Sequence, residues 1–338
     1  MPPALSSNVR ERRWLIGSHA CTSKNLSYAI ISETMNHHPY KIGIIGGGAV
    51  GLAYATILSE QADVVIKTRR PEQADAINAH GITVRPPEGT PGHKDETFTK
   101  ARATTDWTDL TDRDAVIVSV KSFDNPAVAA DLAANLAPDT IILSLQNGLE
   151  ALPALKEHLP HPDRIFGSVI YIGTSRADDH TIVTTGPRRI IVDRRAGKLA
   201  EIMKSTRFPA EETANIKQAI WDKMVLNISQ NALCTVTNRN VGQLITSPDC
   251  LDIIKHILAE FQQVGETEGL KFDYDLMDKV RASFKGLTFY PSMWQDIHAG
   301  RRTEIDAING AISKLGRKHR IPTPYNDMIT SLIKALEI

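Results

Sequence analysis

The sequence predicts an α/β domain with a mainly parallel sheet, followed by an all-α domain. A glycine-rich turn follows the apolar run at residues 41–45, and short β-branched runs alternate with helical segments after it. Strand signals fade from about Ala214 onward, and 338 residues with 42% hydrophobic content can bury two cores. We therefore expect an extension over residues 1–40, an α/β domain over 41–210 and a helical domain over 211–338.

The stretch "KIGIIGGGAVG" places three glycines in the pattern G-x-G-x-x-G directly after a predicted strand. The first glycine permits a tight turn, the second lets a pyrophosphate approach, and the third lets helix and strand pack closely. Free N–H groups at the start of the following helix attract phosphate. A turn without ligand is the alternative. We predict a Rossmann-type dinucleotide site formed by Gly46, Gly47, Gly48, Ala49, Val50 and Gly51.

The next predicted strand, "DVVIK", is followed by Thr68, Arg69 and Arg70. An NAD site usually has Asp or Glu at this position, where it binds the ribose 2′-hydroxyl. A guanidinium instead matches the charge of a 2′-phosphate and can bind it with two hydrogen bonds. The arginines could also be a solvated surface pair. We predict NADPH/NADP+ as the cofactor, with Arg69 among its contacts.

Two further buried strands are predicted at residues 114–120 and 140–145. Lys121 and Asn147 follow their carboxyl ends, where open α/β sheets bind ligands, so both are expected near the reactive end of the cofactor. For Asn147 a plain turn competes, because Asn-Gly is a strong turn dipeptide. The runs "RIFGSVIYIGTS" and "HTIVTTGPRRIIVDRR" are predicted to be antiparallel strands that close the domain.

In the helical domain, "IWDKMVLNISQN" places Lys223, Asn227 and Asn231 at i, i+4 and i+8, which is one stripe of a helix. A solvated surface is the alternative, although asparagine is a poor helix former and an unhelpful choice for an inert face. The later segment "PSMWQDIHAGRRTEIDAING" contains Ser292 and Glu304. Glu304 could equally be a carboxylate in the first turn of a helix.

The composition excludes several classes of protein. Lys+Arg 39 against Asp+Glu 39 gives a net charge of +0, which argues against a nucleic-acid partner. No apolar stretch is long enough to span a bilayer. Cys21, Cys234 and Cys250 lack the spacing of metal ligands, so no metal site is predicted and the thiols fit a reduced, cytoplasmic environment.

Residues 1–34 are mildly basic and Ser-rich, without a clear amphipathic period. Met35 lies a few residues before the first predicted strand. We therefore interpret the extension as the result of a start assigned too far upstream, and we expect it to be disordered. A targeting segment is the alternative, since transit peptides share this composition.

Five motifs together resemble the ketopantoate reductase (2-dehydropantoate 2-reductase) family. They are "KIGIIGGGAVG", "VSVKSFD", "LQNG", "WDKMVLNISQN" and "PSMWQDIHAGRRTEIDAING", in this order from residue 41 toward the C-terminus. The resemblance implies NADPH-dependent reduction of the 2-oxo group of ketopantoate to (R)-pantoate, a step toward pantothenate and coenzyme A. It further implies the following roles: Lys223 and Glu304 catalytic; Asn147, Asn227, Asn231 and Ser292 in contact with substrate; Lys121 and Arg69 in contact with cofactor.

The implied chemistry suits these residue types. A lysine ammonium can stabilise the negative charge on the carbonyl oxygen and donate the proton that the alcohol needs. Burial would lower the pKa of this lysine, and a nearby Glu304 would raise it. One departure is Val241, with Asn240 adjacent, where some family members have a substrate-binding Asn.

Other functions remain as alternatives. A reductase or dehydrogenase for another branched 2-oxo or 2-hydroxy acid would use Lys223 and Glu304 in the same way. A non-catalytic NADP(H) sensor would not need these residues, and a methyltransferase that binds S-adenosylmethionine would give Arg69 no obvious partner. A homodimer is a further expectation.

Overall fold

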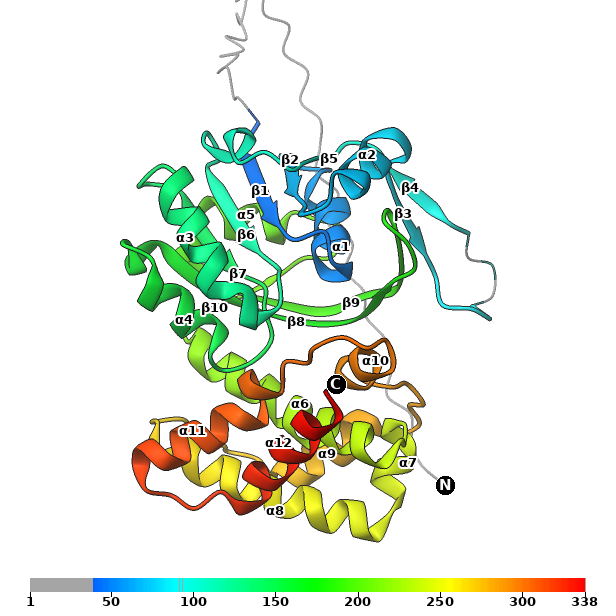
Figure 1. Ribbon diagram of the computed structural model, residues 1–338, viewed down its shortest axis with the longest axis vertical. Helices are drawn as coiled ribbons and strands as arrows, with labels where there is room; N and C mark the ends of the chain where they lie inside the picture. Colours follow the sequence, from blue (N-terminus) through cyan, green and yellow to red (C-terminus); the bar gives the residue numbers. More distant parts are fainter. Residues whose placement is uncertain (1–38, 91, 93, 338) are drawn as a thin grey trace, which may run out of the picture. The chain divides into compact units, whose positions relative to one another are not determined.

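The computed structural model describes residues 39–90, 92 and 94–337 (Figure 1). Most of the predicted extension, including Cys21, lies outside the described residues. Strands dominate the first part of the described chain and helices the second, as Figure 1 shows by the change from blue and green arrows to green, yellow and red helices. This arrangement confirms the predicted fold class.

The N-terminal part is built on a ten-stranded sheet with the order β4-β3-β9-β8-β7-β6-β1-β2-β5, and β10 pairs with β9. The strands are β1 (Lys41–Ile45), β2 (Asp63–Lys67), β3 (Ile82–Arg85), β4 (Glu96–Phe98), β5 (Arg102–Thr104), β6 (Ala115–Val118), β7 (Ile141–Ser144), β8 (Ile165–Arg176), β9 (Thr181–Asp193) and β10 (Glu211–Thr213).

Most neighbouring strands are parallel, as the sequence predicted. The six strands from β8 through β7, β6, β1 and β2 to β5 run in one direction. The pair β8–β9 is antiparallel, which confirms the predicted arrangement of these two long strands. The carboxyl ends of β1, β6 and β7 therefore meet at one edge of the sheet.

Helices cover both faces of this sheet. Residues of β1 and β6 alternate between the two cores: Ile44 and Ile117 pack with α1 (Ala49–Leu58), whereas Ile45 and Val118 pack on the other side. The first core also includes α2 (Pro71–His80) and α5 (Lys198–Lys204), and the second includes α3 (Asn125–Asn135) and α4 (Ala151–His158). Burial on both faces explains why these strands read as continuous apolar runs.

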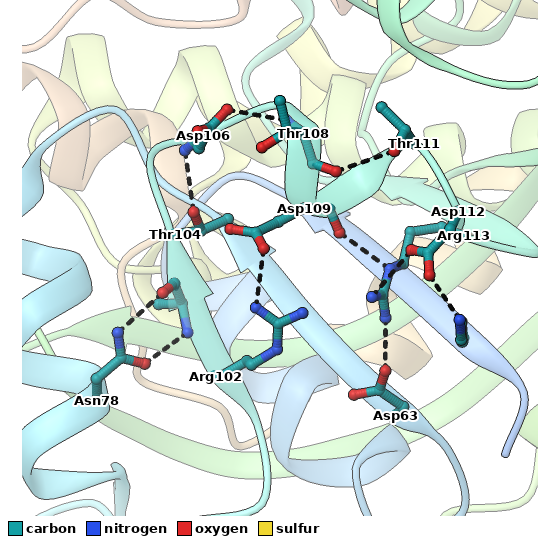
Figure 2. A network of polar contacts seen from close by, with 12 residues as sticks. Asp63, Asn78, Arg102, Thr104, Asp106, Thr108, Asp109, Thr111, Asp112 and Arg113 are labelled. Carbon is teal, nitrogen blue, oxygen red and sulfur yellow. Dashed lines mark hydrogen bonds and ion pairs between the residues drawn. The ribbon is translucent and has the colours of Figure 1, made fainter.

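A buried arginine ties together the amino ends of the central strands (Figure 2). Arg113 lies just before β6, and its guanidinium donates to Asp63 at the start of β2, at 2.7 Å, and pairs with Asp112. Lys41 at the start of β1 also pairs with Asp112. Because these contacts lie at the amino ends, the opposite edge of the sheet is left for the glycine turn.

The C-terminal part is helical and has its own core. Its helices are α6 (Ile216–Thr237), α7 (Val241–Thr246), α8 (Pro248–Thr267), α9 (Leu276–Phe284), α10 (Ser292–His298), α11 (Asn309–His319) and α12 (Pro324–Leu336), with a short 3-10 turn, η5 (Ile305–Ala307).

The first turns of α6 pack directly on the sheet. Ile216 and Ala219 form a small core with Val169 of β8 and Ile191 of β9. Gly167 of β8 permits the approach, because a Cβ there would lie 3.0 Å from the side chain of Ile216. The next turn of α6 carries Lys223, so this contact brings the predicted catalytic lysine beside the sheet.

Candidate active site

The glycine turn leaves β1 with its backbone held from two sides. Gly46 has a φ of +113°, and its N–H donates to the carbonyl of Lys67 in β2 at 3.0 Å. The hydroxyl of Ser119, after β6, donates to the carbonyls of Ile45 and Gly46 at 2.9 and 3.2 Å. At Gly51 a Cβ would lie 2.0 Å from the Gly46 oxygen, so only glycine fits. The turn is therefore fixed before any ligand arrives.

The second glycine of the motif faces open space. A Cβ on Gly48 would meet nothing within 4 Å. Helix α1 begins at Ala49 with no side-chain cap and no acidic residue in its first turn. The first N–H groups of a helix have no partner within the helix, so an anion can bind them. These features fit the pyrophosphate of a dinucleotide.

Gln73 of α2 supports the glycine turn, a role that the sequence does not predict. Its side-chain amide donates to the carbonyl of Gly47 at 2.7 Å and to that of Asp179 at 3.1 Å. Asp179 lies in the turn between β8 and β9. No spacing rule connects a glutamine on the following helix to the glycine motif, so the contact emerges only from the fold.

The two adjacent arginines have different surroundings. The side chain of Arg69 is 82% exposed and pairs with Asp124 at 3.2 Å. Arg70 turns toward the β8–β9 hairpin and pairs with Asp179. Thr68 is buried and donates through its hydroxyl to the carbonyl of Arg70. Arg69 is therefore the arginine with more freedom to meet a ligand after β2.

Lys223 points from α6 toward the loop after β7. Its ammonium donates to the side-chain oxygen of Asn147 at 2.5 Å. Burial lowers the pKa of Lys223 to about 8, and the charge of Glu304 opposes part of that shift. The hydrogen-bond acceptor of Lys223 is a neutral amide. Because its pKa is about 8, the lysine can gain or lose its proton close to neutral pH.

Glu304 is hydrogen bonded to the end of β6 rather than to Lys223. One of its carboxylate oxygens accepts from the ammonium of Lys121 at 3.3 Å and the other from the backbone N–H of Ser122 at 3.1 Å. Lys121 also donates to Asp296 of α10 at 2.7 Å. Burial would lower the pKa of Lys121, but Glu304 and Asp296 outweigh it and raise the pKa above its usual value. Lys121 therefore stays charged.

Asp296 is a site residue for which the sequence predicts no role. Its side chain is 7% exposed and bridges Lys121 and Arg301, whose guanidinium lies 3.0 Å away. In the sequence, nothing distinguishes Asp296 from the other polar residues of its segment. Its partner Lys121 is 175 residues earlier in the chain, a distance that no local pattern spans.

The remaining predicted substrate contacts lie on α6 and α10. Asn231 is 3% exposed, and its side-chain oxygen has no hydrogen-bond partner among the described residues. Asn227, one turn earlier, makes only a weak contact with the sulfur of Met224, at 3.9 Å. Ser292 is exposed at the first position of α10, one turn before Asp296 and on the same side of the helix. None of these three side chains is engaged in a strong hydrogen bond with another described residue.

Comparison with known families gives two matches. The family model described as "Ketopantoate reductase PanE/ApbA" matches residues 42–197, and "Ketopantoate reductase PanE/ApbA C terminal" matches residues 215–337. The chain belongs to the ketopantoate reductase family. It is therefore an oxidoreductase of the 2-dehydropantoate 2-reductase type.

Relatives of this ketopantoate reductase family protein match over nearly their whole length. The 2-dehydropantoate 2-reductase of Streptococcus pyogenes is 28% identical over 308 residues, which cover 87% of this chain and 97% of that protein. The crystal structure of a PanE/ApbA family ketopantoate reductase from Ralstonia eutropha JMP134 has a TM-score of 0.79 at 28% identity, covering 88% of this chain and 98% of that one.

A third similar protein has a different name. The ternary structure of D-mandelate dehydrogenase with NADH and anilino(oxo)acetate has a TM-score of 0.77 at 26% identity, covering 88% of this chain and 98% of that one. Members of this fold thus include a protein that binds NADH and a 2-oxo acid derivative with an aromatic substituent.

This family member has neither a membrane-spanning helix nor a metal-binding cluster within its described residues. None of its helices between residues 39 and 337 is long and apolar enough to cross a membrane. Within the same ranges, no group of three or more His, Cys, Asp or Glu residues is placed to hold a metal ion. A hollow between α8 and α9, lined by residues such as Leu251, Lys255 and Leu276, contains none of the predicted site residues.

Proposed function

We propose that this protein reduces 2-dehydropantoate to (R)-pantoate with NADPH, a step toward pantothenate and coenzyme A. The observation that carries the proposal is the position of Lys223. Its ammonium lies next to Asn147 at the carboxyl edge of the sheet, and burial lowers its pKa to about 8. A proton donor at this edge suits a reaction at the nicotinamide end of a dinucleotide.

Lys223 is the proposed general acid. When bound, the nicotinamide supplies the hydride for the carbonyl carbon. Negative charge then develops on the carbonyl oxygen, and Lys223 stabilises it and donates a proton. Asn147, which holds the ammonium in the free enzyme, keeps the lysine oriented without adding a charge that would raise its pKa.

Glu304 and Lys121 are proposed to assist this proton transfer without donating the proton themselves. The carboxylate of Glu304 favours the protonated form of Lys223 through space, and its own position is fixed by Lys121 and the N–H of Ser122. Asn227, Asn231 and Ser292 offer neutral hydrogen-bonding groups for the hydroxyl and carboxylate of the substrate. The unpartnered oxygen of Asn231 is the clearest of these, since a buried polar atom favours a ligand that satisfies it.

The proposed cofactor site uses Gly46, Gly47, Gly48, Ala49, Val50 and Gly51 for the pyrophosphate, with Lys121 and Asn147 toward the nicotinamide. Arg69 is proposed to bind the 2′-phosphate, because its side chain is exposed beside the end of β2. Its ion pair with Asp124, at 3.2 Å, is also largely exposed on the arginine side. We further expect a cytoplasmic enzyme that forms a homodimer.

The second candidate is a reductase of another branched or aromatic 2-oxo acid. The structural likeness to D-mandelate dehydrogenase bound to NADH and anilino(oxo)acetate favours it. Lys223 and Glu304 would act in the same way, and only the contacts around the substituent of the substrate would differ.

One experiment separates these candidates. The purified protein is mixed with NADPH or NADH and with ketopantoate, phenylglyoxylate or other 2-oxo acids, and the loss of nicotinamide absorbance is followed. Turnover selective for ketopantoate and NADPH supports the main proposal. A preference for phenylglyoxylate or for NADH supports the second, and absence of turnover with every pair contradicts both.

A further inference from the structure

The segment that carries Glu304 has no secondary structure of its own. Residues 301–304 lie between α10 and η5 and belong to neither helix, and only their ends make backbone hydrogen bonds to them: Arg301 N–H to Asp296, and Glu304 carbonyl from Ala307. Glu304 must nevertheless hold one position, because its two oxygens meet Lys121 and the N–H of Ser122 on the sheet. Other contacts must therefore fix this segment.

The strongest of these contacts comes from the last described residue. The backbone N–H and the hydroxyl of Thr303 both donate to the same oxygen of Glu337, at 2.7 and 2.6 Å. The Thr303 hydroxyl also accepts from the N–H of Ile305 at 3.2 Å. Thr303 is 3% exposed and Glu337 is partly exposed, so the donor side of these hydrogen bonds is shielded from water. Hydrogen bonds to a carboxylate are about twice as strong as neutral ones.

Glu337 is an unusual choice for its position in the helix. It directly follows α12, where the negative end of the helix dipole disfavours a carboxylate. The helix that presents it is also anchored at its other end, because Glu260 accepts from the N–H groups of Tyr325 and Asn326 at 2.9 and 3.0 Å. The unfavourable position is explained if the carboxylate is needed by Thr303.

We propose that Glu337 is a positioning residue that acts through Thr303 to hold Glu304 against Lys121 and Ser122. This inference rests on the role of Glu304 given above and extends that site to the C-terminal end of the chain. The same helix also offers a matched control. Lys334, one turn earlier, pairs with Asp306 of η5 at 2.6 Å, but both side chains are about half exposed, so that contact should matter little.

The test compares Glu337→Ala with Glu337→Gln, which keeps an acceptor oxygen, and with the control Lys334→Ala. Amide hydrogen exchange at Ser122, measured by NMR in the full chain, reports whether Glu304 is still in place. Amides of β1 serve as the reference for global opening. In Glu337→Ala we expect exchange at Ser122 to rise about tenfold, the factor for one ordinary hydrogen bond, with β1 unchanged.

Steady-state kinetics provide the second readout. Glu337→Ala should lower kcat about 10- to 100-fold, as expected for a displaced catalytic group, with a smaller change in KM. Glu337→Gln should restore most of both signals, and Lys334→Ala should resemble the unmodified enzyme. If Glu337→Ala does not fold, Thr303→Val, with Thr303→Ser as its conservative partner, asks the same question from the other side of the contact.

The outcomes are distinguishable from those of the proposed function. If the unmodified protein reduces no 2-oxo acid, the proposed function fails, but exchange at Ser122 still decides the role of Glu337. Unchanged protection of Ser122 in folded Glu337→Ala, or a rise of equal size in Lys334→Ala, overturns the positioning role.

Discussion

Lys223 carries its charge in surroundings that disfavour it. Burial lowers its pKa to about 8, and its hydrogen-bond acceptor is an amide rather than a carboxylate. A lysine optimised only for stability would reach solvent or pair with an acid. A charged group whose surroundings make the folded protein less stable than it could be is typical of catalytic residues.

Replacement of Lys223 by Ala should lower kcat about 10²- to 10⁴-fold, because general acid catalysis contributes that much. NADPH should still bind, since the lysine lies outside the glycine turn, and fluorescence titration can check this. Lys217→Ala is the matched control, because Lys217 lies on the same helix but pairs with Glu268. A Lys223→Ala enzyme with near-normal kcat would contradict the assignment.

The pH dependence of the rate follows from the same group. As the proton donor, Lys223 is active when charged, so kcat/KM for reduction should fall as the pH rises through about 8. In Glu304→Gln the carboxylate charge that favours the ammonium is lost, and the fall should begin at lower pH. A profile that stays flat to pH 10 would argue against a lysine acid.

Lys223 should also lower the free energy of unfolding of the protein. Its folded pKa of about 8 lies below the ordinary 10.5, so below pH 8 the folded state must hold a charge that its partly buried surroundings disfavour. Lys223→Met should therefore raise the free energy of unfolding at pH 7, on the order of 1 to 3 kcal/mol. The gain should shrink between pH 8 and pH 10.5 as the wild-type lysine loses its charge. Denaturant titrations at several pH values provide the measurement.

Replacement of Arg69 tests the predicted preference for NADPH over NADH. Arg69→Ala should weaken NADPH binding by about 1.5 to 3 kcal/mol, the strength of a hydrogen bond to a charged group, and leave NADH almost unchanged. Arg70→Ala is the comparison, since Arg70 is paired with Asp179. Dissociation constants for both cofactors test this, and equal losses for NADPH and NADH would show that Arg69 does not read the 2′-phosphate.

At the scale of elements, two glycines of the same turn are expected to have different roles: Gly51 in stability and Gly48 in cofactor binding. A Cβ at Gly51 would meet the Gly46 oxygen at 2.0 Å, whereas one at Gly48 would meet no protein atom within 4 Å. Gly51→Ala should therefore lower the melting temperature. Gly48→Ala should leave it unchanged but weaken dinucleotide binding, because the methyl group occupies the approach of the pyrophosphate. Thermal unfolding with and without cofactor distinguishes the two effects.

The elements that the sequence predicted are those with strong local signals. The runs at 41–45 and 63–67 form β1 and β2 as expected, and β6 and β7 lie within the predicted 114–120 and 140–145. The short edge strands β4, β5 and β10 were not identified individually, because three polar or mixed residues carry too little periodicity. They form because a neighbouring strand offers its hydrogen-bonding edge.

The sequence predicts most residues of the site but not the hydrogen bonds between them. Spacing placed Lys223, Asn227 and Asn231 on one helix, and topology placed Lys121 and Asn147 at the ends of strands. The hydrogen bonds of Glu304 with Lys121 and Ser122 join positions 183 and 182 residues apart, and such pairs depend on how the helical part packs on the sheet. Gln73 and Asp296 were missed for the same reason.

At the scale of the whole molecule, one carboxylate links three segments of the helical part. Glu268 follows α8 and meets His319 at 2.6 Å, and Lys318 and Lys217 at 3.2 Å each. The hydrogen bond from His319 is the main cause of its lowered pKa, about 2, with Lys318 and Lys217 adding to it despite burial. This cluster joins the start of α6 to the end of α11.

The stability that Glu268 contributes should depend on pH. Because its folded pKa is below the ordinary 4.5, the contribution is present above that pH and is lost as the pH falls toward 2. Glu268→Gln should lower the free energy of unfolding at pH 7 by on the order of 1 to 2 kcal/mol and have little effect near pH 2. Glu201→Gln, in an exposed pair with Lys198, should change little at either pH.

The division of the site between two stretches of chain has a practical consequence for dissecting the protein. A cut between β10 and α6 would leave the glycine turn, Lys121 and Asn147 on one fragment, and Lys223 and Glu304 on the other. Neither fragment alone would hold both the proposed cofactor turn and the proposed acid. Turnover regained on mixing them would measure fragment complementation, so this junction suits a split-enzyme reporter of association.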